Sequence, residues 1–174
     1  LNPGTARVAD VNRYLFDLDA TRLAVTNHAV FFRGDGRYRS KIGVLPRSAR
    51  DVLGSWNADA GVLTLVRFHP LEREGAYANG FTGPQPNPWE GDVIDSYNDG
   101  PMGGAVGTRA SFYELESCSP AKPLARGESV THTHQTFHLE GPRKELDRVA
   151  RAVLGLGLDE ISAALQPSPS AGAN

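Results

Sequence analysis

Two glutamates near the middle of the second half of the chain have the type and spacing for acid–base chemistry. Glu114 and Glu116 lie in the segment 112–121, and we expect a strand at 111–117, so they share one face. Two carboxylates at this spacing repel each other, and burial would raise the pKa of at least one. A carboxyl group of that kind serves as a general acid or base near neutral pH. The alternative is a solvated strand face with two ordinary glutamates.

Three histidines follow in the segment 127–141. His132, His134 and His138 alternate with other residues and share one strand face with Glu140. Histidines at i and i+2 can chelate one metal ion with a third ligand from elsewhere, and the pattern loosely resembles the first motif of cupin barrels. His138 lies about 13 Å beyond His134 at ~3.3 Å per residue. We therefore expect no native metal site; the imidazoles would instead line a groove or face solvent.

A third group is cationic. Arg37, Arg39 and Lys41 alternate with uncharged residues, so a strand would carry them on one face. Such a face can hold an acidic sugar or pair with Glu114 and Glu116. The alternative is a solvated sheet edge protected by its charge.

Hydrogen-bonding side chains lie at the end of another expected strand. Asp95 and Asn98, with Tyr97 and Asp99 beside them, could bind sugar hydroxyls at a strand end. The sequence Asn-Asp-Gly-Pro from residue 98 onward is equally typical of a tight turn, and both interpretations remain open.

Short strands must position these residues. The 19 glycines and 12 prolines fall between short apolar runs, which favours strands and turns. A long loop is expected at 75–88 because Gly, Pro, Asn and Gln dominate it. The early strands should form an antiparallel meander. The expected strands are 22–26, 29–33, 38–45, 52–56, 62–69, 91–97, 111–117 and 129–139.

After Gly141 the spacing of apolar residues changes from the period of a strand to that of a helix. Pro142 suits the first turn of a helix, and five apolar residues then recur on one helix face: Leu146, Val149, Ala150, Val153 and Leu154. We expect helices within 142–165 and a disordered tail at 166–174. The sequence thus predicts a mainly β chain, one domain over residues 1–165: an antiparallel β-sandwich with C-terminal α-helices.

Composition limits the function. Lys plus Arg number 18 and Asp plus Glu 20, giving a net charge of −2 without basic runs, so we expect no nucleic-acid partner. No apolar stretch approaches the ~20 residues that span a bilayer. Cys118 is the single cysteine, which excludes an intrachain disulfide. Phosphate-binding loops and nucleophile elbows are absent from the sequence, and we expect no cofactor.

Three segments, 31–43, 91–101 and 112–141, together resemble an uncharacterised bacterial family classed as a domain of unknown function and common in planctomycetes. The resemblance runs from about Val11 to Leu165. It implies a relation to galactose-mutarotase-like β-supersandwiches, of which this chain would be a C-terminal portion without the N-terminal part. Family members often carry export signals, so a periplasmic or secreted location is implied.

The mutarotase comparison adds a catalytic residue. Aldose epimerases carry their base in a Glu-x-Gln-x-x-Pro-x-Ala segment followed by a Pro-Gly-Glu turn. The run from Glu116 to Ala121, followed by Arg126-Gly-Glu128, is similar in layout, although Cys118 replaces the Gln and the Pro comes one position early. This resemblance implies that Glu116 is the catalytic base, and that the acid histidine lies upstream in the absent part.

The expected function is carbohydrate binding or carbohydrate processing, with Glu116 as the catalytic residue. The alternatives are a non-catalytic structural or sugar-binding module of an exported protein, and a cupin-like metal-binding protein. The expected substrate-binding residues are Glu114, His132, His134, Arg39, Arg37, Asp95 and Asn98.

Overall fold

Short antiparallel strands build most of the protein. The computed structural model describes residues 10–80, 84, 86–102, 106 and 112–166. A four-stranded sheet has the order β1 (Val11–Arg13), β4 (Ser40–Val44), β7 (Ile94–Asn98), β8 (Glu116–Ser117). A three-stranded sheet has the order β5 (Val52–Asn57), β6 (Val62–His69), β9 (Thr133–Glu140). A separate hairpin pairs β2 (Leu23–Val25) with β3 (Val30–Phe32).

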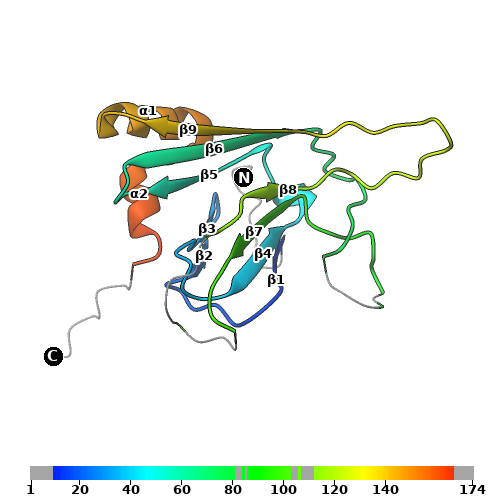
Figure 1. Ribbon diagram of the computed structural model, residues 1–174, viewed down its shortest axis with the longest axis horizontal. Coiled ribbons are helices and arrows are strands. Elements are labelled where there is room, and N and C mark those ends of the chain that lie inside the picture. Colours follow the sequence, from blue (N-terminus) through cyan, green and yellow to red (C-terminus); the bar gives the residue numbers. More distant parts are fainter. Residues whose placement is uncertain (1–9, 81–83, 85, 103–105, 107–111, 167–174) are drawn as a thin grey trace.

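The two larger sheets lie as layers, with helix α1 (Arg143–Leu154) on the outer side of the three-stranded sheet (Figure 1). Helix α2 (Leu158–Ala163) follows it and lies beside β5. A short 3-10 helix, η2 (Pro46–Ser48), links the sheets between β4 and β5. Every strand pairing is antiparallel. The predicted mainly β, sandwich-like fold with C-terminal helices is confirmed.

Helix α1 is held to the sheet by its apolar face. Leu146 and Ala150 are buried with Leu63 and Leu65 of β6 in one cluster. The helix ends at Gly155, whose φ of 77° is the left-handed conformation that glycine adopts without steric strain.

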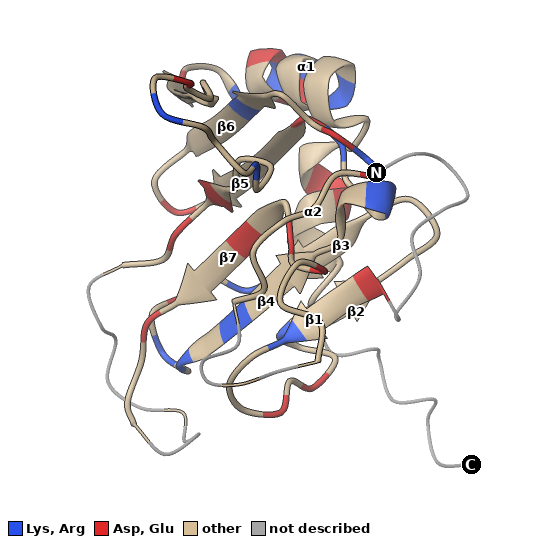
Figure 2. Ribbon diagram, turned by 90° about the vertical axis from the view of Figure 1, so that its right-hand side faces the viewer, with Lys and Arg blue, Asp and Glu red and all other residues tan. Residues whose placement is uncertain are grey.

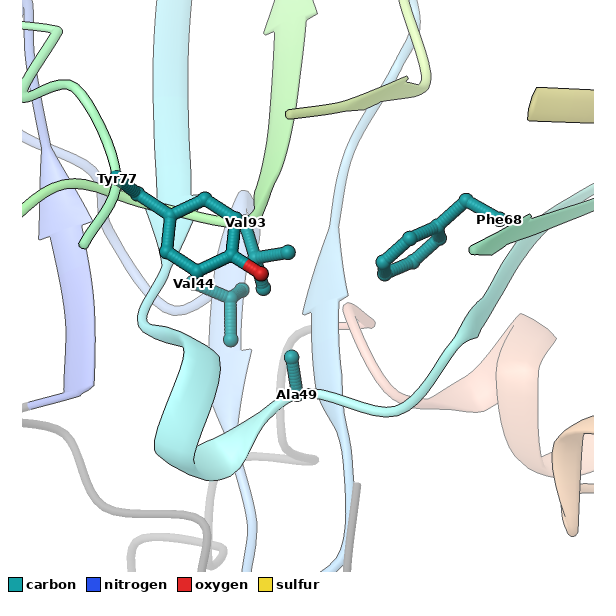
Figure 3. Close-up of a cluster of buried hydrophobic side chains, with 5 residues drawn as sticks. All are labelled: Val44, Ala49, Phe68, Tyr77 and Val93. Atoms are coloured by element: carbon teal, nitrogen blue, oxygen red, sulfur yellow. The ribbon is translucent and has the colours of Figure 1, made fainter. Parts of the chain in front are cut away.

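A small cluster joins the two layers. Phe68 of β6 points toward Val44 at the end of β4, and Ala49, Tyr77 and Val93 fill the space around them (Figure 3). Tyr77 and Val93 have no exposed surface. The cluster therefore links the three-stranded sheet, which α1 covers, to the four-stranded sheet.

The strand predictions were right in kind and inexact in extent. The expected strand 111–117 is regular only at β8, with a single bridge from Tyr113 to Asn98, and Ser111 lies outside the described residues. Strand β1 was not predicted, because its three residues are too few to show a period. The expected meander is wrong beyond its hairpins, since β4 pairs with β1 and β7 while β6 pairs with β9.

Neither helix in the described part of the chain is long and apolar enough to cross a membrane. The predicted tail, apart from Gln166, falls outside the described residues.

Candidate functional site

A row of side chains crosses the four-stranded sheet on the face that points away from the core. Asn12 pairs with Gly43, Gly43 with Asp95, and Asp95 with Glu116, so the four residues stand opposite one another on neighbouring strands. Because side chains alternate along a strand, the residues beside them, such as Ile42, point into the core instead. This surface is called the polar face below.

Asp92 lies over the middle of the polar face. A Cβ atom added to Gly43 would overlap the Asp92 carboxylate, so glycine is what leaves room for it. Asn12 Nδ2 donates hydrogen bonds to Asp92 Oδ1 at 3.0 Å and Oδ2 at 3.3 Å. The Tyr14 hydroxyl donates to Oδ2. Burial raises the pKa of Asp92 to about 6, and burial together with Asp92 raises the pKa of Tyr14.

Lys41 lies between the two carboxylates at the other end of the row. Its Nζ atom is 3.6 Å from Asp95 Oδ1 and 3.6 Å from Glu116 Oε2. Burial alone would lower the pKa of Lys41, but the charges of Asp95 and Glu116 raise it. Burial raises the pKa of Asp95 despite Lys41. In Figure 2, β7 carries a red acidic segment and the neighbouring β4 a blue basic segment.

Cys118 extends the polar face by one residue beyond β8. Its Sγ donates to Asp95 Oδ2 at 3.3 Å, and burial followed by the Asp95 charge raises the pKa of the thiol to about 12. Cys118 is therefore a neutral donor that holds Asp95, rather than a thiolate nucleophile.

Two carboxylate oxygens of the polar face have no hydrogen bond among the described residues. Asp95 Oδ1 and Glu116 Oε1 are both shielded from solvent. Buried polar atoms are nearly always hydrogen-bonded, so an unsatisfied pair on one surface needs an explanation. Lys41 Nζ, 3.6 Å from Asp95 Oδ1, compensates the charge of that oxygen. The Glu116 side chain is 35% exposed in spite of its shielded Oε1, so its exposed part is what a ligand would contact.

Glu114 lies on the same face as Glu116, as the sequence predicts. Its N–H donates to Tyr97 O at 2.8 Å, which continues the register of β7 and β8. The side chain is exposed, and desolvation together with the nearby Glu116 raises its pKa. Glu114 thus forms the rim of the polar face, whereas Glu116 belongs to its interior.

A pocket of about 380 Å³ adjoins the polar face. Asn12 belongs to both, because its side chain binds Asp92 and lines the pocket. Asn79, Asn87 and the guanidinium-bearing Arg47 line it further. Trp89 also lines it and is 61% exposed, an unusual position for an indole ring.

The histidines lie on the opposite side of the four-stranded sheet. Ser117, which pairs with Ile94 on the core-facing side, brings them together: its Oγ is 2.9 Å from His132 Nε2 and 2.8 Å from His134 Nδ1. Burial and the neighbouring imidazole of His134 lower the pKa of His132. The structure therefore joins His132 and His134 to each other, but not to Glu116.

The remaining predicted site residues are dispersed. Arg39 Nη2 pairs with Asp99 at 3.0 Å, so Lys41 rather than Arg39 meets Glu116. Arg37 is exposed. Asn98 has no exposed surface; it accepts from Gly36 N and donates to Tyr38 O, which fixes the loop before β4.

Four polar-face residues were not predicted from the sequence: Asn12, Tyr14, Gly43 and Asp92. Asp92 and Tyr14 flank strands and belong to no recognisable motif. The sequence around Gly43 also does not indicate that this glycine leaves space for a carboxylate. Trp89 had a usable signal, since it is a lone aromatic residue next to a polar Pro- and Asn-rich loop.

Among the described residues, no three or more His, Cys, Asp or Glu side chains are grouped so that they could hold a metal ion. The polar face instead offers several oxygen acceptors around one ammonium group, with an aromatic ring nearby. Such a surface suits a small ligand that is rich in hydrogen-bond donors.

The chain belongs to a family of unknown function, DUF6786, whose model matches residues 2–165. No curated protein matches the chain. Solved structures also give no match.

Proposed function

We propose that the protein binds a carbohydrate on the polar face, and that it is related to the galactose-mutarotase-like proteins. The observation that carries the proposal is the group of three carboxylates, Asp92, Asp95 and Glu116, which lie with Lys41 on one sheet face beside a pocket of about 380 Å³. Sugar hydroxyls donate to such acceptors, and charged acceptors make the stronger hydrogen bonds. An exported location and a bacterial source, both implied by the sequence resemblance, belong to this proposal.

The pocket beside the polar face supports the same ligand class. Trp89 exposes its ring there, and Asn12 connects the pocket to Asp92. Sugars have apolar C–H faces that pack on aromatic rings while their hydroxyls reach polar side chains at the edge. One ligand could therefore pack on the Trp89 ring and donate hydrogen bonds to the carboxylates of the polar face.

The charge of the polar face favours a neutral sugar. Asp92, Asp95 and Glu116 surround the one ammonium group of Lys41. An acidic sugar would place its carboxylate among these like charges. We expect D-galactose or D-glucose to bind more tightly than D-glucuronate.

Calorimetry with matched carboxylate variants tests the binding proposal. Glu116→Gln keeps the shape of the side chain and removes its charge, and Glu114→Gln makes the same change on the exposed rim. We expect Glu116→Gln to lose at least tenfold in affinity for a neutral monosaccharide and Glu114→Gln to change it little. Equal affinities for both variants and wild type would contradict the proposed site. Absence of binding to every sugar tested would favour a purely structural module.

Proton transfer at the anomeric carbon is a second candidate function. In mutarotation a base removes the proton of the anomeric hydroxyl while an acid protonates the ring oxygen. Glu116 is the base that the resemblance implies, and Lys41 Nζ lies 3.6 Å from its Oε2. The imidazoles of His132 and His134 lie on the opposite face, so the candidate acid on the polar face is Asp92, whose pKa is about 6.

Anomer exchange of D-galactose, followed by NMR, separates the two candidates. An enzyme would accelerate exchange over buffer and lose that acceleration in Glu116→Gln and in Asp92→Asn. A binding protein would bind the sugar without accelerating exchange. The cupin-like alternative needs ligands that converge on one point, and the described residues contain no such group, so we do not propose it.

A further inference from the structure

Strand β9 is a sheet edge that no other described strand covers. It forms one side of the three-stranded sheet, pairs with β6 alone among the described residues, and has seven of its eight residues exposed. Helix α1 packs on one face of the sheet, against β5, β6 and the Leu139 side chain of β9, and this packing forms no pairing with the backbone edge of β9 in the described part of the chain. Figure 1 shows β9 along the outer margin of its layer.

The backbone of β9 offers a regular set of unpaired groups. Phe68 N donates to Asp51 O, so Phe68 directs its backbone bonds toward β5. Its neighbours along β6 must then bond to β9, because backbone groups alternate in direction along a strand. Their partners in the register are Thr133 and Gln135. The N–H and C=O groups of the even-numbered residues, His134 to Glu140, consequently point outward.

Natural proteins usually protect such an edge. The common devices are Lys side chains, Pro, a bulge or a covering segment. Strand β9 has the sequence THQTFHLE, without Lys, Arg or Pro, and its eight pairings to β6 run without a bulge. Phe137, in the middle of the strand, is 43% exposed. An edge of this length and composition is suited to pairing with another strand.

We propose that β9 pairs antiparallel with β9 of a second copy of the chain, joining the two three-stranded sheets across a two-fold axis. Only pairings that set even residues opposite even residues satisfy the outward backbone groups. Among these, the one with Phe137 on the axis uses residues 134–140. It sets His134 opposite Glu140 of the second copy, a complementary pair when the imidazole is protonated.

This register also accounts for the exposed aromatic ring. Phe137 would stand opposite its own copy in a non-hydrogen-bonded pair, where side chains approach most closely. Shifting the register by two residues would instead put Thr136 on the axis and set His134 opposite His138, which loses both the aromatic and the charge complementarity. A second copy is thus the partner that the sequence of β9 fits, and the proposal does not depend on the proposed function.

Sedimentation velocity over a dilution series tests the pairing. We expect wild type to dimerise and Thr136→Pro to be monomeric, because proline removes an outward N–H while the ladder to β6 keeps its bonds. Thr136→Ala keeps that N–H and is the matched control, expected to dimerise as wild type does. Circular dichroism checks that the fold is retained. A wild type that stays monomeric throughout the series would overturn the proposal.

Disulfide cross-linking tests the register independently. In a Cys118→Ser background, Phe137→Cys places two thiols opposite each other across the axis, within the Cα separation that disulfides require. Gln135→Cys, two residues away, would lie too far from its own copy and is the control. We expect oxidation to link Phe137→Cys into covalent dimers and to leave Gln135→Cys monomeric. Efficient linking of Thr136→Cys in place of Phe137→Cys would overturn the proposed pairing.

Discussion

Gly43 and Asp92 show how one residue without a side chain makes the polar face possible. The carboxylate of Asp92 occupies the space that a Cβ atom of residue 43 would fill. Asn12 in the neighbouring strand β1 and Tyr14 just after that strand hold the carboxylate. Four residues from three parts of the chain therefore fix one buried charge at the centre of the candidate site.

Gly43→Ala should disturb this arrangement directly. The new methyl group would displace the Asp92 carboxylate from its donors, and overpacking of this kind costs roughly 1–3 kcal/mol. Gly80→Ala is the control, because its Cβ would lie 3.5 Å from the Tyr14 ring, an ordinary contact. Urea unfolding measures both variants. Equal stability of Gly43→Ala and wild type would show that Asp92 does not need the space above residue 43.

Asp92 should also make stability depend on pH. Its pKa is raised from 3.8 to about 6, so the folded protein holds a proton that the unfolded chain releases at lower pH. The resulting stabilisation is complete below pH 3.8 and is lost as the pH rises to about 6. The difference is roughly 3 kcal/mol, from 1.36 kcal/mol per pKa unit.

Asp92→Asn isolates that contribution, since the amide cannot ionise. Between pH 4 and pH 6, wild type should lose stability relative to Asp92→Asn, as measured by urea unfolding across the pH range. Subtracting the variant removes the contribution of Asp95, whose pKa is raised as well. Parallel pH profiles for the two proteins would contradict the raised pKa.

At the scale of elements, hydrophobic periodicity predicted the secondary structure of long segments and failed to predict that of short ones. The strand expected at 62–69 is β6 residue for residue, and the helix expected after Gly141 is α1. Strand β1 has three residues and β8 has two, so neither shows a period, and both exist because β4 and β7 offer them an edge. The alternation argument still placed Glu114 and Glu116 on one face, because β7 enforces it.

Leu146→Ala tests the packing of α1. Leu146 is 4% exposed and lies among Leu63, Leu65 and Ala150. Removing a buried leucine side chain costs about 2–5 kcal/mol. Lys144→Ala, on the exposed side of the same helix, should change stability by less than about 0.5 kcal/mol. Thermal unfolding that leaves Leu146→Ala unchanged would mean that the helix does not dock.

At the scale of the whole molecule, the candidate site is a product of strand order that the sequence does not reveal. The polar face needs β1, β4, β7 and β8 side by side, and these strands are separated by long stretches of chain. The sequence identified Glu116 and Asp95 as candidates and a cationic strand face, including Lys41, that could pair with Glu116. It also grouped these carboxylates with Arg39, His132 and His134. The sheet brings them to Lys41, as one alternative predicted, and to Asp92 and Tyr14, while the histidines lie on the other side.

Phe68 links the two layers, so its loss should affect both. Phe68 is 3% exposed within the cluster of Figure 3. Phe68→Ala should lower stability by about 3–5 kcal/mol. Hydrogen exchange should accelerate in β4 and β7 as well as in β6, because the cluster contains Val44 and Val93. Acceleration confined to the three-stranded sheet would show that the layers are stable independently.

The central claim is that a carbohydrate binds the polar face and the adjoining pocket, and the fluorescence of Trp89 tests it most directly. The chain has two tryptophans, so Trp56→Phe leaves Trp89 as the single reporter in the pocket. Titration with D-galactose or D-glucose should then give a saturable change in emission that Glu116→Gln removes and Glu114→Gln keeps. The claim is contradicted if no neutral sugar changes the emission, or if the change survives in Glu116→Gln.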